Sequence, residues 1–157
     1  MSIPKKRRSR YNPANEDFRK EDFPYYWLAR VHARYSMAME KQLKKINLDV
    51  ARWRVLNILF ENNESSISEI SEHAIAKLST ITKIVYRMKE DGFVETYQSI
   101  QDGRVTQVRL TEAGRQAFFT MHDLTDDLVQ SSFRGLTEAQ LRKLNQILSS
   151  MFSNLPE

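Results

Sequence analysis

The chain has 157 residues, 41% of them hydrophobic, which suits one compact domain with a core of ordinary size. It contains no cysteine, and this excludes structural disulfides, thiolate metal sites and thiol-based sensing. We find neither a transmembrane run nor a secretory signal, so we expect a soluble cytoplasmic protein that makes no contact with a membrane.

The net charge of +4 arises in the first ten residues, which hold five cations and no acid: Lys5, Lys6, Arg7, Arg8 and Arg10. Residues 11–157 contain the other 19 of the 24 cations and all 20 acids, so their net charge is −1. We expect residues 1–12 to form a disordered basic arm that either follows nucleic-acid phosphates or only aids solubility. The rest of the chain must gather positive charge on one face if it binds a nucleic acid.

The first predicted helix begins near Pro24, which suits a first helical turn, and ends near Asn47, which suits a C-terminal cap. Its apolar stripe recurs with helical spacing at Trp27, Val31, Tyr35, Met39, Leu43 and Ile46. A second helix begins after Asp49, whose carboxylate can cap it, and extends to about Glu61. Residues 24–61 are therefore predicted to be mainly helical.

These two helices carry an unusual density of aromatic rings beside cationic groups. A small aromatic carboxylate could stack its ring in the apolar part while an arginine or a protonated histidine pairs with the carboxylate. The candidate ligand-binding residues are Tyr26, Trp27, Arg30, His32, Arg34 and Trp53. The alternative is that the rings belong to the core or to a dimer interface and that His32 is a structural histidine.

A helix-turn-helix is predicted from Ser66 onward. Ser66 and Glu69 have the spacing of a capping box, which starts a short helix. One side of the next helix is apolar, at Ile81, Ile84, Val85 and Met88. The opposite side carries groups that could reach phosphates and base edges in a major groove, namely Ser79, Thr80, Thr82, Lys83, Tyr86 and Arg87. Taken alone, this helix could equally be an ordinary solvated surface helix.

Two short strands are predicted after Gly92, which ends the second helix. On the return strand one face carries Val105, Gln107 and Arg109 and the other carries Thr106, Val108 and Leu110, so one face can point inward. Asp102-Gly103 indicates a two-residue turn between the strands. Arg104 lies at the exposed tip, where its guanidinium could enter a minor groove. A helix-turn-helix followed by such a hairpin is typical of a winged helix that reads DNA.

The end of the chain is predicted to form two more helices. Thr111 caps the first, and a capping box of Thr137 and Gln140 starts the second. Their apolar stripes include Phe118, Phe133, Leu148, Met151 and Phe152. We expect residues 13–47 and 111–157 to form a helical dimerisation region beside a DNA-binding region at residues 48–110. A two-fold dimer would need a pseudo-palindromic site, with recognition helices about 34 Å apart. The alternative is that these stripes complete the core of a monomer.

Several motifs occur together in this part of the chain. They are Ser79-Thr-Ile-Thr-Lys-Ile-Val85, Asp91-Gly-Phe-Val94, Asp102-Gly-Arg104, Val108-Arg-Leu-Thr111 and Gly114. With these motifs, residues 48–114 resemble the MarR family of bacterial transcriptional regulators. Lys77-Leu78 departs from the acidic or hydroxyl cap with which many members begin the recognition helix. The resemblance implies a mainly α fold with a small β-wing (α+β), namely a winged helix-turn-helix with N- and C-terminal dimerisation helices.

The resemblance also implies a function. It implies a homodimeric repressor that binds a pseudo-palindromic operator in double-stranded DNA. Similarity to regulators of aromatic-acid catabolism implies release by a small aromatic acid of hydroxycinnamate or indoleacetate type. The alternatives are an activator, a winged helix that binds protein, and a metal-responsive regulator using His122-Asp123 and Asp126-Asp127, although we favour a solvated acidic face for these four residues. We expect neither an enzyme nor a cofactor, because no catalytic motif occurs.

Overall fold

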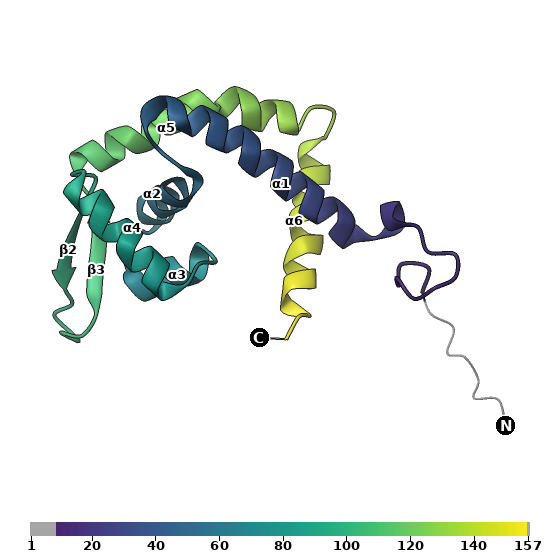
Figure 1. The fold of residues 1–157 in the computed structure, drawn as a ribbon, viewed down its shortest axis with the longest axis horizontal. Coiled ribbons are helices and arrows are strands. Elements are labelled where there is room, and N and C mark those ends of the chain that lie inside the picture. Colours follow the sequence, from purple (N-terminus) through teal and green to yellow (C-terminus); the bar gives the residue numbers. More distant parts are fainter. Residues whose placement is uncertain (1–8, 157) are drawn as a thin grey trace. The chain divides into compact units, whose positions relative to one another are not determined.

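A computed structural model describes residues 9–156, which are mainly helical with one small antiparallel sheet, and so confirms the predicted α+β class. The chain divides into two compact units, the first ending at Leu124 and the second beginning at Thr125. Figure 1 shows the elements in order along the chain. None of the helices in the described part is long and apolar enough to cross a membrane.

The first unit opens with turns and a short 3₁₀ helix, η1 (Lys20–Asp22). Arg10 forms an ion pair with Asp22 at 3.0 Å, whereas the basic residues at positions 5–8 of the predicted arm lie outside the described residues. Helix α1 (Pro24–Leu43) begins with proline in its first turn, as expected. It continues into the 3₁₀ helix η2 (Lys44–Ile46).

Asn47 ends this helical segment and Asp49 starts the next one, as the sequence predicted. Asn47 has φ 56°, a left-handed conformation that asparagine tolerates better than most residues. The Asp49 side chain accepts a hydrogen bond from the Arg52 amide at 2.8 Å and so caps α2 (Val50–Asn62). Helix α1 contributes Met39 and Leu43 to the core, and α2 contributes Val55, Leu56 and Leu59.

The helix-turn-helix consists of α3 (Ile67–His73) and α4 (Leu78–Glu90), which pack against each other. Ser66 and Glu69 form the predicted capping box at the start of α3. The core side chains from the two helices are Ile70, Ile81, Val85 and Met88. Helix α4 also contacts α2 and β2, so its buried side is fixed by three neighbouring elements.

The sheet has three strands in the order β1-β3-β2, where β1 is Glu64–Ser66, β2 is Val94–Gln98 and β3 is Thr106–Leu110. Both pairings are antiparallel, with Val94 opposite Leu110 in the β2–β3 hairpin. Figure 1 shows this hairpin beside α4. The sequence predicted the hairpin but not β1, because three polar residues carry no alternating pattern.

Helix α5 (Glu112–Ser132) follows the hairpin directly. Thr111 caps it, since the Thr111 Oγ1 accepts a hydrogen bond from the Gly114 amide at 3.0 Å. The same hydroxyl donates to the Gly92 carbonyl at 2.6 Å. Gly92 has φ 80°, as expected for the glycine that ends α4. The end of α4 and the start of α5 are thereby joined by one side chain.

The second unit contains the last residues of α5 and helix α6 (Glu138–Ser153). The predicted capping box of Thr137 and Gln140 is present. No residue of α6 is buried within the described part of the chain. Large apolar side chains therefore remain exposed in this unit, among them Phe133, Leu136, Leu144, Ile147, Phe152 and Leu155.

Candidate nucleic-acid interface

Helix α4 separates its apolar and polar residues as the sequence predicted. Ile81, Val85 and Met88 are fully buried and Ile84 is half-buried. On the other side, five of the predicted DNA-binding residues are exposed, namely Ser79, Thr80, Lys83, Tyr86 and Arg87. A regular helix with one anchored side holds these groups in fixed register, which a recognition surface requires.

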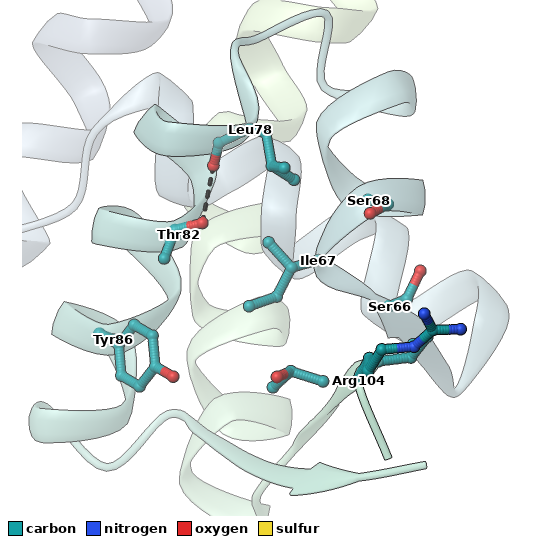
Figure 2. Close-up of a pocket in the computed structure, with 9 residues that line it drawn as sticks. Ser66, Ile67, Ser68, Leu78, Thr82, Tyr86 and Arg104 are labelled. Atoms are coloured by element: carbon teal, nitrogen blue, oxygen red, sulfur yellow. Dashed lines mark hydrogen bonds between the residues drawn. The ribbon is translucent and has the colours of Figure 1, made fainter. Parts of the chain in front are cut away.

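The sixth predicted residue of this helix, Thr82, is half-buried, and its hydroxyl is already used. Thr82 Oγ1 donates to the Leu78 carbonyl at 2.8 Å (Figure 2). In this rotamer Thr82 can offer DNA a methyl group and an acceptor but no donor. Beside it, a groove of about 280 Å³ lies between α3, α4 and the start of β3, with Ile67, Leu78 and Tyr86 among its lining residues.

The start of α4 differs from that of α3. Lys77 occupies the N-cap position of α4 and makes no capping hydrogen bond with its side chain. The turn before it contains Ile75 with φ 53°, which is costly for a β-branched residue, although its side chain is 89% exposed. The capping box of α3, by contrast, lowers the pKa of Glu69 through hydrogen bonds from the Ser66 amide and hydroxyl. The first turn of α4 thus lacks the side-chain cap that secures α3.

The tip of the wing is longer than the predicted two-residue turn. Seven residues, 99–105, connect the two strands, and the loop is closed by a hydrogen bond from the Ser99 amide to the Val105 carbonyl at 2.9 Å. Gly103 is not in the positive-φ region that a two-residue hairpin turn of type I′ requires. The prediction of a two-residue turn was therefore wrong.

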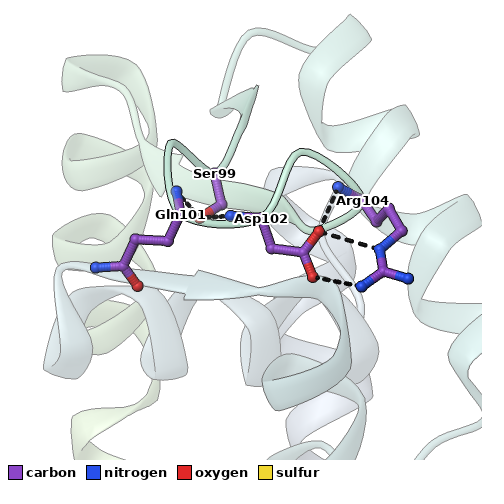
Figure 3. Close-up of polar contacts among 4 residues, drawn as sticks. All are labelled: Ser99, Gln101, Asp102 and Arg104. Carbon is purple, nitrogen blue, oxygen red and sulfur yellow. Dashed lines mark hydrogen bonds and ion pairs between the residues drawn. The ribbon is translucent and has the colours of Figure 1, made fainter.

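Arg104 is exposed on this loop, as predicted, but it is held by a carboxylate. Its Nε lies 3.1 Å from Asp102 Oδ1 and its Nη2 lies 3.3 Å from Asp102 Oδ2, while the Arg104 amide also donates to Oδ1 at 3.0 Å (Figure 3). These bonds to Arg104 lower the pKa of Asp102. The guanidinium is thus held in one orientation, with a negative charge directly beside it.

Three further cations of this surface differ in whether they are paired. Arg109 donates to Glu95 at 2.5 Å and lies over the Tyr97 ring, so its charge is neutralised on the sheet. Lys83 and Arg87 form no ion pair with any residue of the described chain. These two residues of α4 are the cations best placed to meet phosphates.

Sequence reasoning missed the role of Arg52, whose side chain is only 10% exposed. Its Nη1 donates to the Asn47 carbonyl at 3.0 Å and lies 3.7 Å from Asp91 Oδ2 at the end of α4. Its Nε lies 3.6 Å from Asp49 Oδ2. Arg52 therefore links α2 to both the end of η2 and the end of α4, a connection between distant segments that no local motif could indicate.

The structure brings three of the six predicted ligand-binding residues together. Trp27, Arg30 and Arg34 line an open groove of about 670 Å³ along α1. Tyr26 packs edge-on against Trp27, and the Arg30 guanidinium lies 5.3 Å from the Tyr26 ring centre. His32 is exposed and does not line this groove.

Trp53, the sixth of these residues, is separate from the groove on α1. Its ring packs against Tyr35, with 6.3 Å between ring centres. The Trp53 indole nitrogen is buried and has no hydrogen-bond partner among the described residues.

The structure also bears on the metal-responsive alternative. Within residues 9–156, no group of three or more His, Asp or Glu side chains is arranged to hold a metal ion. His122 lies 3.0 Å from the Asn57 amide oxygen.

Comparison with known proteins connects these features to a family. A family model described as transcriptional regulator SarA/Rot matches residues 38–121. The chain is 66% identical over 151 residues to the HTH-type transcriptional repressor IacR of Pseudomonas putida, covering 96% of this chain and 90% of that protein. It is 22% identical to the homoprotocatechuate degradative operon repressor of Escherichia coli, covering 71% and 75% of the two chains.

Solved structures share the fold. A MarR-family transcriptional regulator from Silicibacter pomeroyi superimposes with a TM-score of 0.80 at 24% identity, covering 88% of this chain and 93% of that one. NadR in complex with 4-hydroxyphenylacetate gives a TM-score of 0.73 at 18% identity, covering 80% and 89%. The helix-turn-helix, the wing and the 66% identical repressor lead to one conclusion: the chain belongs to the MarR family of winged helix-turn-helix transcriptional regulators.

Proposed function

We propose that the protein is a homodimeric repressor that binds a pseudo-palindromic operator through α4 and the wing and is released by a small aromatic acid. The observation that carries the DNA-binding part is the outer side of α4. There Lys83 and Arg87 are exposed without an ion pair to any described residue, beside the hydroxyls of Ser79 and Thr80. Groups of this kind, on a helix narrow enough for a major groove, suit phosphates and base edges.

The exposed apolar side chains support the dimer. Helix α6 buries none of its residues within the described chain, and α1 exposes Trp27, Val31 and Met37. Exposed apolar surface of this extent indicates an interaction site, and a second copy of the chain is its proposed partner. A two-fold dimer would place two α4 helices on successive major grooves, about 34 Å apart.

The groove on α1 supports an aromatic acid as the effector. Trp27 offers a ring for stacking, and Arg30 and Arg34 offer cationic donors for a carboxylate. The E. coli relative is a homoprotocatechuate degradative operon repressor, and NadR was solved in complex with 4-hydroxyphenylacetate. Each tenfold loss of operator affinity requires the acid to prefer the released state by only about 1.4 kcal/mol.

Affinity measured at several salt concentrations tests the DNA-binding part. The probe is a duplex that the protein selects from a random-sequence pool. Lys83→Ala and Arg87→Ala should each weaken binding and lower the slope of log affinity against log salt by about 1. Lys143→Ala removes a matched exposed charge from α6 and should leave the slope unchanged. If the two α4 variants bind as the wild type does, this surface serves a protein partner instead.

Release is tested with the same duplex and a panel of small aromatic acids that includes a hydroxycinnamate and indoleacetate. We expect at least one acid to weaken DNA binding in the wild type, and Arg34→Ala to need more of that acid for the same effect. Arg34 lies outside the helix-turn-helix, so DNA binding without the acid should be retained. Operator affinity that no acid changes would contradict the sensing part alone.

A further inference from the structure

Leu78 is an exposed apolar residue beside the polar side chains of α4. It is the first residue of the helix, is 52% exposed, and is followed by the exposed hydroxyl residues Ser79 and Thr80. It lines the groove of about 280 Å³ between α3, α4 and β3 together with Ile67 and Tyr86 (Figure 2). The groove therefore has an apolar part beside the exposed polar residues of α4.

The position of this groove argues for part of a DNA duplex as its occupant. Leu78, Thr82 and Tyr86 of α4 line it together with Arg104 of the wing, so the groove lies between the two elements that are proposed to contact DNA. A duplex held by Lys83 and Arg87 would cover it.

Thr82 adds a second apolar group to this region. Its hydroxyl proton is donated to the Leu78 carbonyl at 2.8 Å, so it is not free to donate to a phosphate or base. Tyr86 is 47% exposed and lies about one turn beyond Thr82, and about two turns beyond Leu78, on the same side of the helix. Leu78, Thr82 and Tyr86 are spaced four residues apart, so they form a single row facing the groove.

The major groove of B-DNA presents one apolar group, the 5-methyl of thymine, and residues at the start of a recognition helix are those that reach base edges. Resting on the proposed DNA-binding function, we propose that Leu78 is a specificity-determining residue that contacts a thymine methyl, with Tyr86 completing the apolar contact. A polar residue at position 78 would lack this preference. The contact selects thymine over cytosine by burying the methyl group rather than by a hydrogen bond.

Uracil substitution tests the proposal, because 2′-deoxyuridine differs from thymidine only in that methyl group. In a duplex selected by the wild-type protein from a random-sequence pool, each thymine is replaced in turn. We expect the wild type to lose about fourfold in affinity at one thymine of each half-site, the ratio that corresponds to about 0.8 kcal/mol for one buried methyl. Replacement of the other thymines should change affinity less.

Two variants then assign the effect to its residue. Leu78→Ala should bind the thymine and uracil duplexes equally, while Leu78→Met, which stays apolar, should retain the difference. Ile100→Ala removes an exposed apolar side chain from the wing loop, one that does not line the groove, and should also retain the difference between the thymine and uracil duplexes.

Three results would overturn the proposal. One is a wild-type protein that binds a selected duplex but is insensitive to uracil at every position, and another is a Leu78→Ala variant that keeps the full difference. Both leave the DNA-binding function standing. If the pool yields no enriched duplex, the DNA-binding function fails, and this inference fails with it.

Discussion

Replacing Gly114 by alanine should destabilise the winged helix, because the added Cβ would overlap the backbone of Phe93. An ideal Cβ on Gly114 falls 2.0 Å from the Phe93 carbonyl oxygen and 3.0 Å from its carbon. That oxygen also accepts the Thr111 amide at 3.0 Å, and Thr111 in turn caps α5 and binds the Gly92 carbonyl. The new methyl group meets rigid backbone, because Phe93 lies between the end of α4 and the start of β2 and Gly114 lies in the first turn of α5.

The size of the destabilisation follows from how far the backbone of Phe93 and Gly114 must separate. Ordinary contact begins at about 3.4 Å, so the backbone has to separate by more than 1 Å. This breaks the Thr111–Phe93 hydrogen bond and disturbs the cap, at about 1 kcal/mol each. Residual crowding costs about 2 kcal/mol, and the higher helix propensity of alanine returns about 1 kcal/mol. We expect a net loss of about 3 kcal/mol in the free energy of unfolding.

Urea unfolding followed by circular dichroism measures this loss, at one fixed protein concentration because association links stability to concentration. Gly103→Ala is the matched control, since nothing lies within 4 Å of a Cβ there and Gly103 has no positive φ. It should stay within about 0.5 kcal/mol of the wild type. A Gly114→Ala protein that unfolds within about 1 kcal/mol of the wild type would refute the close approach to Phe93.

Two further predictions concern the helix-turn-helix. Ile75 adopts φ 53° while its side chain is 89% exposed, so Ile75→Asn should raise the free energy of unfolding by about 1 kcal/mol in urea, and a lower value would contradict the strain. Because the bonds from Ser66 lower the pKa of Glu69, the stability they contribute is complete above the carboxyl's ordinary value of 4.5 and is lost as pH falls through the lowered pKa. Glu69→Gln, which keeps an acceptor but does not titrate, should flatten this part of the profile of stability against pH, and two parallel profiles would disprove the linkage.

The predictions that succeeded rest on local chemistry. Asp49, the Ser66–Glu69 pair and Thr137 each cap the helix that the sequence assigned to them, because a capping side chain bonds to backbone only two or three residues away. The buried side of α4 was equally predictable, since helical geometry alone decides which residues share a side. The resemblance of the motifs to the MarR family was confirmed by the relatives.

The features that the sequence did not reveal depend on contacts between distant segments. Strand β1 exists because its backbone pairs with β3, and its three polar residues give no sign of this. The buried contacts of Arg52 join segments that are 39 residues apart at Asp91, which no spacing rule covers. The wing loop was mispredicted for a different reason. Asp-Gly favours a two-residue turn only when glycine takes a positive φ, and here the closure from Ser99 to Val105 makes the loop longer.

The pairing of charges explains how residues 11–157, whose net charge is only −1, can still present a cationic surface. Arg104 and Arg109 each have a carboxylate partner, at 3.1 Å and 2.5 Å, so a phosphate that reaches either one must compete with Asp102 or Glu95. Lys83 and Arg87 have no such competitor among the described residues. On the proposed function, α4 therefore supplies more of the salt-dependent attraction to DNA than the wing, which offers an arginine of fixed orientation with little net charge. With this division the wing would respond to the shape of the minor groove while α4 contacts the phosphates, and the apolar row at Leu78 would remain available to contact a base.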